Sequence, residues 1–253
     1  DDDKWQTGDD IIVNGFGLSE TEQGAYSRRQ RVSADWLVKL PKGLSPRQAM
    51  AIGTAGYTAM LCVQALEDHG VKPQDGEILV SGATGGVGSI AIMILAKLGF
   101  SVVAVTGRME HQDYLKSLGA SDVIERGELD RDAKAMEKER WAGVVDCVGG
   151  KTLSTAIAQT KYNGTVTACG LAGGFALNST VMPFILRGVK LIGIDSVMAS
   201  ISKRQKAWLR LAQDIDLDLL EQGITDIDFN DVPTACADLL EGRTKGRMVV
   251  KVN

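Results

Sequence analysis

Glycines spaced three residues apart, between two apolar segments, form the stretch of this sequence most suited to binding chemistry. The stretch runs Ser81-Gly-Ala-Thr-Gly-Gly-Val-Gly88. The apolar run before it predicts a buried strand, and the apolar spacing after it predicts a buried helix. Glycines let a backbone turn sharply and approach a pyrophosphate, whose oxygens can bind the free amides at a helix start. We therefore predict a dinucleotide-binding turn; a tight steric turn that binds nothing is the alternative.

The end of the following strand indicates which dinucleotide the turn would serve. In such folds an acidic residue about 20 residues beyond the first glycine holds the ribose hydroxyls of NAD. This chain instead has Thr106, Gly107 and Arg108 at the end of a strand-like apolar run. A hydroxyl, a small residue and a guanidinium suit a 2'-phosphate, so the pattern favours NADPH. The alternative reading of Arg108 is a solvated surface charge.

Composition and charge exclude several classes of protein. The chain has 253 residues, of which 44% are hydrophobic and 24% charged, as in ordinary globular proteins. The net charge is -4 and no basic block appears, so nucleic acid and anionic membranes are not expected partners. No apolar run approaches the roughly 20 residues of a membrane span, and no leader pattern opens the chain. We expect a cytoplasmic protein with a small-molecule substrate.

Cysteine and histidine usage predicts no metal site. The cysteines are scattered in or beside apolar segments: Cys62, Cys147, Cys169 and Cys236. This distribution suits reduced core thiols better than a disulfide framework. The only histidines are His69 and His111, and no pair has metal-ligand spacing, so zinc is not expected. His69 precedes Gly70 at an expected helix end, where it would interact with the helix dipole.

Strand and helix patterns alternate regularly after the glycine turn. Helical patterns fall near residues 110–118, 133–140, 150–160 and 180–187. Between them lie apolar runs that predict strands at 78–80, 102–105, 123–124, 144–148, 165–169 and 191–194. This alternation predicts an α/β fold with a doubly wound, parallel, six-stranded Rossmann sheet. The expected strand order is 3-2-1-4-5-6, with the ligand across the carboxyl ends of the strands.

The two ends of the chain predict a different organisation. A loop over Asp1 to Lys4 leads into short strands at 11–13, 25–32 and 36–40, too few for a core of their own. Ser45 and Pro46 predict a helix start, and 53–68 reads as a second helix. Helical patterns cover 202–220 and 232–241, and Lys161 and Tyr162 read as a turn. The last strand, at 246–252, is expected to rejoin the sheet of the first segment.

With these elements in place, the chain resembles the zinc-free branch of the medium-chain dehydrogenase/reductase superfamily. It is most similar to the quinone-oxidoreductase-like, acrylyl-CoA reductase group, and the resemblance runs through nearly the whole chain. Three motifs are more specific than the glycine turn: Thr106-Gly-Arg108, Ala168-Cys-Gly-Leu-Ala-Gly-Gly174 and Val181-Met-Pro-Phe-Ile-Leu-Arg187. Such proteins begin with further strands of a GroES-like domain, so the resemblance implies that the N-terminal part of that domain is absent here.

The resemblance implies three regions and a set of cofactor-binding residues. The regions are a partial GroES-like substrate domain at 1–45, a Rossmann NADPH-binding domain at 46–205, and a C-terminal return to the substrate domain at 206–253. The pyrophosphate would be held by Thr84, Gly85, Gly86 and Val87, and the 2'-phosphate by Thr106, Gly107 and Arg108. Arg126 would be a second phosphate clamp, or alternatively a surface charge opposite Glu125 and Glu128.

Further positions would border the nicotinamide. Leu171, in the segment Cys169-Gly-Leu171, would line that side of the site, and Ser196 would close it. Thr58 is a weaker candidate, because a helical threonine commonly bonds its own backbone, and Arg247 is weaker still. No residue is assigned a catalytic role, since no histidine-centred acid/base pair appears.

The implied reaction is NADPH-dependent reduction of an activated carbon-carbon double bond, with acrylyl-CoA giving propionyl-CoA. Two alternatives stay open from the sequence. The first is an NADPH:quinone reductase, and the second is a protein that binds NADPH without turnover. The resemblance also implies a homodimer, formed through the sheet edge near residues 189–194.

Overall fold

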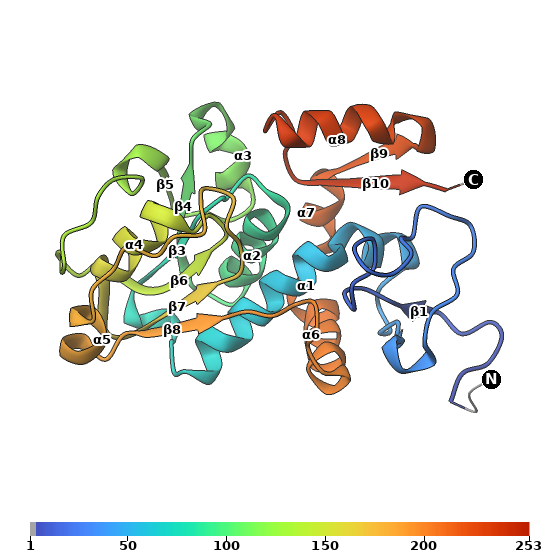
Figure 1. The fold of residues 1–253 in the computed structure, drawn as a ribbon, viewed down its shortest axis with the longest axis horizontal. Helices are drawn as coiled ribbons and strands as arrows, with labels where there is room; N and C mark the ends of the chain where they lie inside the picture. The colour runs from blue at the N-terminus through green and yellow to red at the C-terminus, as the bar shows by residue number, and fades with distance from the viewer. Residues whose placement is uncertain (1–3, 253) are drawn as a thin grey trace.

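A six-stranded parallel sheet forms the centre of the computed structural model, which describes residues 4–252 (Figure 1). The residues Asp1 to Asp3 of the expected opening loop, and Asn253, lie outside the described part. The strand order is β5-β4-β3-β6-β7-β8, and every neighbouring pair is parallel. In chain order the strands are β3 (Glu77–Val80), β4 (Ser101–Thr106), β5 (Asp122–Glu125), β6 (Trp141–Asp146), β7 (Thr160–Ala168) and β8 (Lys190–Gly193). The predicted fold class and the order 3-2-1-4-5-6 are confirmed.

The sheet is buried on both faces because its strands carry apolar residues at successive positions. Ile78 and Val80 pack in one hydrophobic cluster with helices α1 (Pro46–Asp68) and α2 (Gly86–Lys97). Leu79, between them in β3, packs on the opposite face with Leu153 of helix α4 (Gly150–Gln159). Successive side chains of a strand point to opposite faces, so helices must cover both. This layering places the carboxyl ends of the strands at one common edge.

Helix α1 joins the two helices predicted over residues 45–68. Ser45 and Gln48 form a reciprocal capping box at its start, which satisfies the first free amides. Gly53 breaks the helical geometry with φ 52° and ψ -161°, a conformation that favours glycine. The helix is long and apolar enough to cross a membrane, so the expectation that no segment reaches that length was wrong. However, 72% of its most apolar window is buried, as in a core helix.

The two ends of the chain form small sheets of their own, seen at one side of the central sheet in Figure 1. Strands β1 (Ile11–Ile12) and β2 (Val38–Lys39) pair antiparallel. Strand β10 (Arg247–Lys251) pairs parallel with β9 (Ile224–Asp228), and helix α8 (Val232–Leu240) connects them. The prediction that the last strand rejoins the first sheet was wrong, because this crossover unit provides β10 with a neighbour of its own. The helices α6 (Ile201–Asp214) and α7 (Leu217–Gln222) precede this unit.

Two predicted elements do not form. Residues 25–32 contain no strand, and the polar run from Ser27 to Arg31 is largely exposed. Residues 133–140 contain no helix, because the groups around Glu137 bond to distant partners. The Glu137 amide donates to the Ala158 carbonyl at 2.9 Å, and its carbonyl accepts from Arg187 at 2.6 Å. Both backbone groups are therefore satisfied outside a helix.

The carboxylate of Glu137 anchors the same segment. It accepts hydrogen bonds of 2.7 and 2.6 Å from the two terminal nitrogens of Arg131, and one of 2.9 Å from Gln159. The hydrogen bond from Arg131 is the main reason that the pKa of Glu137 falls to about 2.

The other short helices are α3 (Gln112–Ser117) and α5 (Met182–Arg187).

Candidate functional site

The glycine turn joins β3 to α2 with a geometry that larger residues would prevent. Gly82 adopts φ 60°, and a Cβ added at Gly88 would lie 2.5 Å from the Gly82 carbonyl oxygen. The Cα of Ala83 would be 2.7 Å away, so the added Cβ would clash with the backbone of two successive residues. No side chain caps α2, whose N-cap residue is Gly85. The first amides of this helix therefore face the turn, as an anion site requires.

A buried hydrogen-bond network fixes the adjoining strand ends. The Ser81 hydroxyl donates to one oxygen of Asp146 at 2.6 Å, and the Gly149 amide donates to the other at 2.7 Å. The Cys147 amide donates to the Ser81 oxygen at 3.0 Å. Burial raises the pKa of Asp146, although these hydrogen bonds oppose the shift. The network ties β3 to β6 at the point where the strand order reverses, which is where ligands bind in open α/β sheets.

One cavity of about 550 Å³ lies against this network. Most of the residues predicted to bind the cofactor line it: Thr84, Gly85, Gly86, Val87, Thr106, Gly107, Arg108 and Arg126. They come from the glycine turn, from the end of β4, and from the segment after β5. The turn between α8 and β10 closes the cavity with Gly242 and Thr244. The structure thus brings three separate predicted segments together around a single space.

The end of the cavity formed by β4 is cationic. Arg108 donates to the Thr84 hydroxyl at 2.6 Å and to the carbonyls of Gly242 and Thr244 at 2.5 and 2.8 Å. Its amide donates to the Thr106 hydroxyl at 3.0 Å. These partners contradict the reading of Arg108 as a merely solvated charge. The guanidinium instead ties the C-terminal turn to the glycine turn.

Arg126 provides the second guanidinium at this end. It lies so close to Gly107 that an added Cβ there would be 3.1 Å from the Arg126 Cζ atom. Its ion-pair partner is Asp130 at 3.9 Å, rather than the Glu125 or Glu128 considered from the sequence. Such a long pair on exposed side chains binds weakly, so the guanidinium keeps most of its capacity to donate. Two guanidiniums and a hydroxyl beside one small residue form a suitable site for a phosphate dianion.

The two residues predicted to border the nicotinamide do not line this cavity. Leu171 is 66% exposed, although its neighbours Ala172 and Gly173 contribute to the wall. Ser196 follows β8, and its carbonyl accepts a 3.2 Å hydrogen bond from Arg204. The Arg204 side chain is fully buried and also donates to the carbonyls of Asn14, Val197 and Ala199. The roles of Leu171 and Ser196 at the nicotinamide stay predictions.

The position of Arg247 suits phosphate binding better than the sequence suggested. Its Nε donates to the Ala51 carbonyl at 2.7 Å, and burial lowers its pKa. A Cβ added at Gly86 would lie 2.5 Å from its Nη1, so the guanidinium is packed on the start of α2. No carboxylate within residues 4–252 forms an ion pair with it. A partly buried cation beside free helix amides is a good partner for a phosphate anion.

Two structural alternatives from the sequence are confirmed. The Thr58 hydroxyl donates to the Thr54 carbonyl at 2.7 Å, as expected of a helical threonine. The Nδ1 atom of His69 lies 2.8 Å from the Ala65 carbonyl, so this histidine interacts with the end of α1. In the described part of the chain, no three or more histidine, cysteine or acidic residues group as metal ligands.

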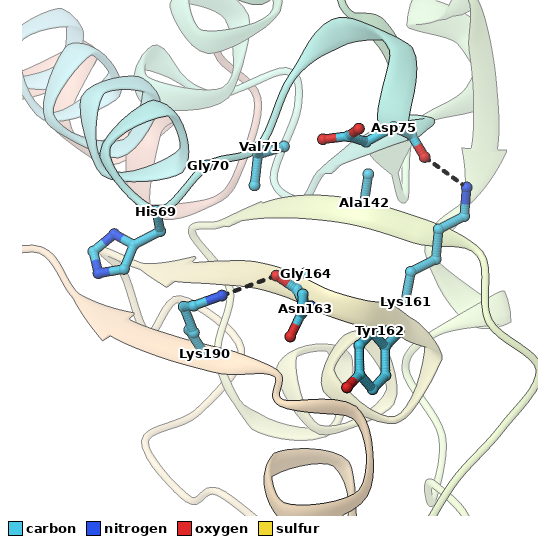
Figure 2. A pocket seen from close by; sticks show the side chains of 10 residues that line it. All are labelled: His69, Gly70, Val71, Asp75, Ala142, Lys161, Tyr162, Asn163, Gly164 and Lys190. Carbon is cyan, nitrogen blue, oxygen red and sulfur yellow. Dashed lines mark hydrogen bonds between the residues drawn. The ribbon is translucent and has the colours of Figure 1, made fainter.

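A second cavity, of about 490 Å³, lies near the amino ends of β6, β7 and β8 (Figure 2). Lys161 donates to the Asp75 carbonyl at 2.9 Å, and Lys190 donates to the Asn163 carbonyl at 3.0 Å. The turn predicted at Lys161 and Tyr162 was wrong, since both belong to β7. No predicted site residue reaches this cavity, which lies at the end of the sheet opposite the glycine turn.

Comparisons with known proteins agree with this architecture. A family model described as zinc-binding dehydrogenase matches residues 86–213. The acrylyl-CoA reductase AcuI of Ruegeria pomeroyi is 52% identical over 253 residues, which are 100% of this chain and 77% of that protein. The structure of the yhdH oxidoreductase from Salmonella enterica in complex with NADP has a TM-score of 0.98 at 49% identity. It is covered over 78% of its length by 100% of this chain.

A Bacillus subtilis protein is similar over the same extent. The putative quinone oxidoreductase YhfP is 45% identical over 253 residues, covering 99% of this chain and 77% of that protein. The structure of yhfP with NAD bound has a TM-score of 0.96 at 44% identity, over 99% of this chain and 77% of that one. The chain thus spans about three quarters of the length of these relatives. With its glycine turn at the switch point of a six-stranded sheet, the chain belongs to the quinone-oxidoreductase-like, acrylyl-CoA reductase group of the medium-chain dehydrogenases and reductases.

Proposed function

We propose that this chain binds NADPH and reduces an activated carbon-carbon double bond, converting acrylyl-CoA to propionyl-CoA. The observation that carries the proposal is the cavity at the switch point, with Arg108 at the strand end where an NAD site would have an acid and with Arg126 lining the same cavity. The AcuI relative is named for acrylyl-CoA reduction, and the Salmonella yhdH structure is a complex with NADP. Both matches extend over the whole of this chain.

Different residues around the cavity would bind the pyrophosphate and the 2'-phosphate of the cofactor. The amides at the start of α2, in the segment from Gly86 to Gly88, would hold the pyrophosphate, with the Arg247 guanidinium beside them. Arg108, Arg126 and the Thr106 hydroxyl would bind the 2'-phosphate. A Cβ at Gly88 would fill the turn, so the cradle depends on glycine and fits a bound pyrophosphate.

The chemistry follows from the charge that develops on the substrate. When bound, NADPH supplies a hydride to the β-carbon of the enoyl thioester, while a proton reaches the α-carbon. Negative charge collects on the thioester oxygen, where backbone amides or hydroxyls must stabilise it. No histidine of the described chain lines the cavity, so we assign no catalytic residue.

Quinone reduction is a second candidate, supported by the YhfP relative, whose name is putative quinone oxidoreductase. The same cofactor site serves both reactions. The discriminating experiment therefore measures NADPH consumption with acrylyl-CoA and with a benzoquinone, under equal conditions. Propionyl-CoA, identified by mass spectrometry, is the expected product. Turnover of the quinone alone would replace the first proposal by the second, and NADPH binding without either turnover would remove both.

We also propose a homodimer formed through the edge strand β8. This strand has one neighbour in the sheet, and large apolar side chains are exposed in the segments just before and after it in the chain. Ile185 of α5 is 72% exposed and Met198 is 66% exposed. Exposed apolar patches of this kind usually mark interfaces. Light scattering should find a dimer that Ile185→Glu weakens. The control Leu240→Glu, on the exposed helix α8, should leave the dimer intact. A monomeric unsubstituted chain would refute this proposal.

The division of the chain and its location are further proposals. We retain the boundaries 1–45, 46–205 and 206–253, and we expect limited proteolysis to cleave near residues 45 and 205 before it cleaves the central sheet.

We also propose a cytoplasmic location, where NADPH is available to a reductase. Fractionation of cells that produce the protein tests the location.

A further inference from the structure

Three cysteines that are distant in the sequence meet at the carboxyl ends of β6 and β7. Cys147 and Cys169 directly follow the paired residues Asp146 and Ala168, and the Cys169 amide donates to the Asp146 carbonyl at 2.9 Å. Their sulfur atoms are 3.8 Å apart. Neighbouring strands are about 4.8 Å apart, a separation that a disulfide can bridge. The two thiols therefore need only a side-chain rotation to react with each other.

The two thiols interact with each other and differ in the direction of their pKa shifts. Hydrogen bonds from Cys147, and then from Cys62, lower the pKa of Cys169 to about 4. The interaction with Cys169, followed by burial, raises the pKa of Cys147. The lower pKa favours Cys169 as the attacking thiolate, once its thiol gives up the 3.3 Å hydrogen bond that it donates to the Asp146 carbonyl. Both Cys147 and Cys169 are partly exposed, whereas Cys62 is buried beneath them.

We propose that Cys147 and Cys169 form a reversible disulfide on exposure to a peroxide, and that the disulfide weakens cofactor binding in the adjacent cavity. The Cys169 sulfur attacks one peroxide oxygen, the O–O bond breaks, and a sulfenic acid and one water form. The Cys147 sulfur then attacks the Cys169 sulfur and displaces the second water. The two thiols lose two electrons and two protons together, and the peroxide is reduced to two waters.

The effect on the cofactor, which rests on the proposed function, follows from the position of Cys147. This residue lines the cavity, and a Cβ added at Gly82 would lie 3.3 Å from its own Cβ. Its amide also donates to Ser81, within the network that holds β3 to β6. Rotation of Cys147 toward Cys169 therefore changes the wall beside the glycine turn. Because linkage is reciprocal, bound NADPH should also slow the oxidation.

The test treats the protein with hydrogen peroxide and then with dithiothreitol. Intact mass should show the loss of two hydrogens, and peptide mapping should place the bond between Cys147 and Cys169. Cys169→Ser should abolish the bond, whereas Cys147→Ala should leave a sulfenic acid on Cys169 that dimedone traps. Cys236→Ser, which removes the exposed thiol of α8, should leave disulfide formation unchanged.

Cofactor binding is measured on the same samples by NADPH fluorescence. Oxidation should lower the affinity about tenfold, within the usual range for coupled sites, and dithiothreitol should restore it. A bond between Cys62 and Cys169, the absence of any disulfide, or an unchanged affinity after oxidation would overturn the proposal. Failure of the reduced protein to bind NADPH would count against the proposed function instead, because the mass measurement does not depend on the cofactor.

Discussion

Replacing Arg108 by alanine should change the preference between NADPH and NADH. The Arg108 guanidinium points at the glycine turn and donates to Thr84, Gly242 and Thr244. In the proposed complex it is one of two guanidiniums at the 2'-phosphate, the other being that of Arg126 beside Gly107. NADH lacks that phosphate. The substitution should therefore weaken NADPH binding much more than NADH binding.

The magnitude follows from the bonds that the side chain can make. A guanidinium can donate two hydrogen bonds to a phosphate, and bonds to charged groups contribute about 1.5–3 kcal/mol each. Arg126 remains in the variant and the site is partly solvated, so the loss is expected at the lower end, about 2–3 kcal/mol. This corresponds to a loss of NADPH affinity of about 30–150-fold. The lost bonds to Gly242 and Thr244 affect both cofactors equally and cancel in the ratio.

Fluorescence titration of each cofactor gives the two dissociation constants. Arg243→Ala is the matched control, because Arg243 lies in the same turn but pairs with Asp238 and Glu241. It should leave the NADPH/NADH ratio unchanged. If Arg108→Ala also leaves the ratio unchanged while both cofactors bind, Arg108 does not recognise the 2'-phosphate and the assignment is refuted.

Three further changes test other parts of the structure. Gly88→Ala should lower the free energy of unfolding by about 1–3 kcal/mol and weaken NADPH binding. The control is Gly193→Ala, which has nothing within 4 Å of its added Cβ and should unfold at the normal denaturant midpoint. Equal midpoints for the two variants would contradict the steric account. Arg204→Met should lower the free energy of unfolding by about 2–4 kcal/mol, because the buried Ala199 carbonyl and the part-buried carbonyls of Asn14 and Val197 lose their donor. An unchanged denaturant midpoint would show that these carbonyls find other donors. The stabilisation by Glu137 is complete above its ordinary pKa of 4.5 and is lost as the pH falls toward about 2. Thermal unfolding of Glu137→Gln should thus approach that of the unsubstituted protein as the pH falls, and a constant difference would refute the assignment.

Much of the fold could be predicted because it depends on local patterns. Each β-strand of the central sheet contains a short apolar run, and the helices between them repeat with a helical period, so the doubly wound order could be predicted. The failures occurred where distant contacts decide. Glu137 forms its backbone hydrogen bonds with Ala158 and Arg187 instead of within a helix, and β10 pairs with β9. These partners are too far away in the sequence to be identified from a short stretch of it.

The site divides in the same way. The convergence of Thr84 to Val87 and Thr106 to Arg108 on one cavity could be predicted, since the carboxyl ends of adjacent parallel strands meet at one edge. Arg247 was only a weak candidate from the sequence, because its approach to Gly86 joins residues far apart in the chain. The pairing of Cys147 with Cys169 was hidden for the same reason, since only the register of β6 and β7 brings the sulfurs within 3.8 Å.

The most direct test of the proposed function is NADPH oxidation in the presence of acrylyl-CoA, with the product identified by mass spectrometry. It is run on this chain and on a version extended by the part of the AcuI relative that lies outside the 77% covered by this chain. We expect one molecule of propionyl-CoA for each NADPH consumed. Tight NADPH binding by both versions, without propionyl-CoA from either, would contradict the assignment as an acrylyl-CoA reductase.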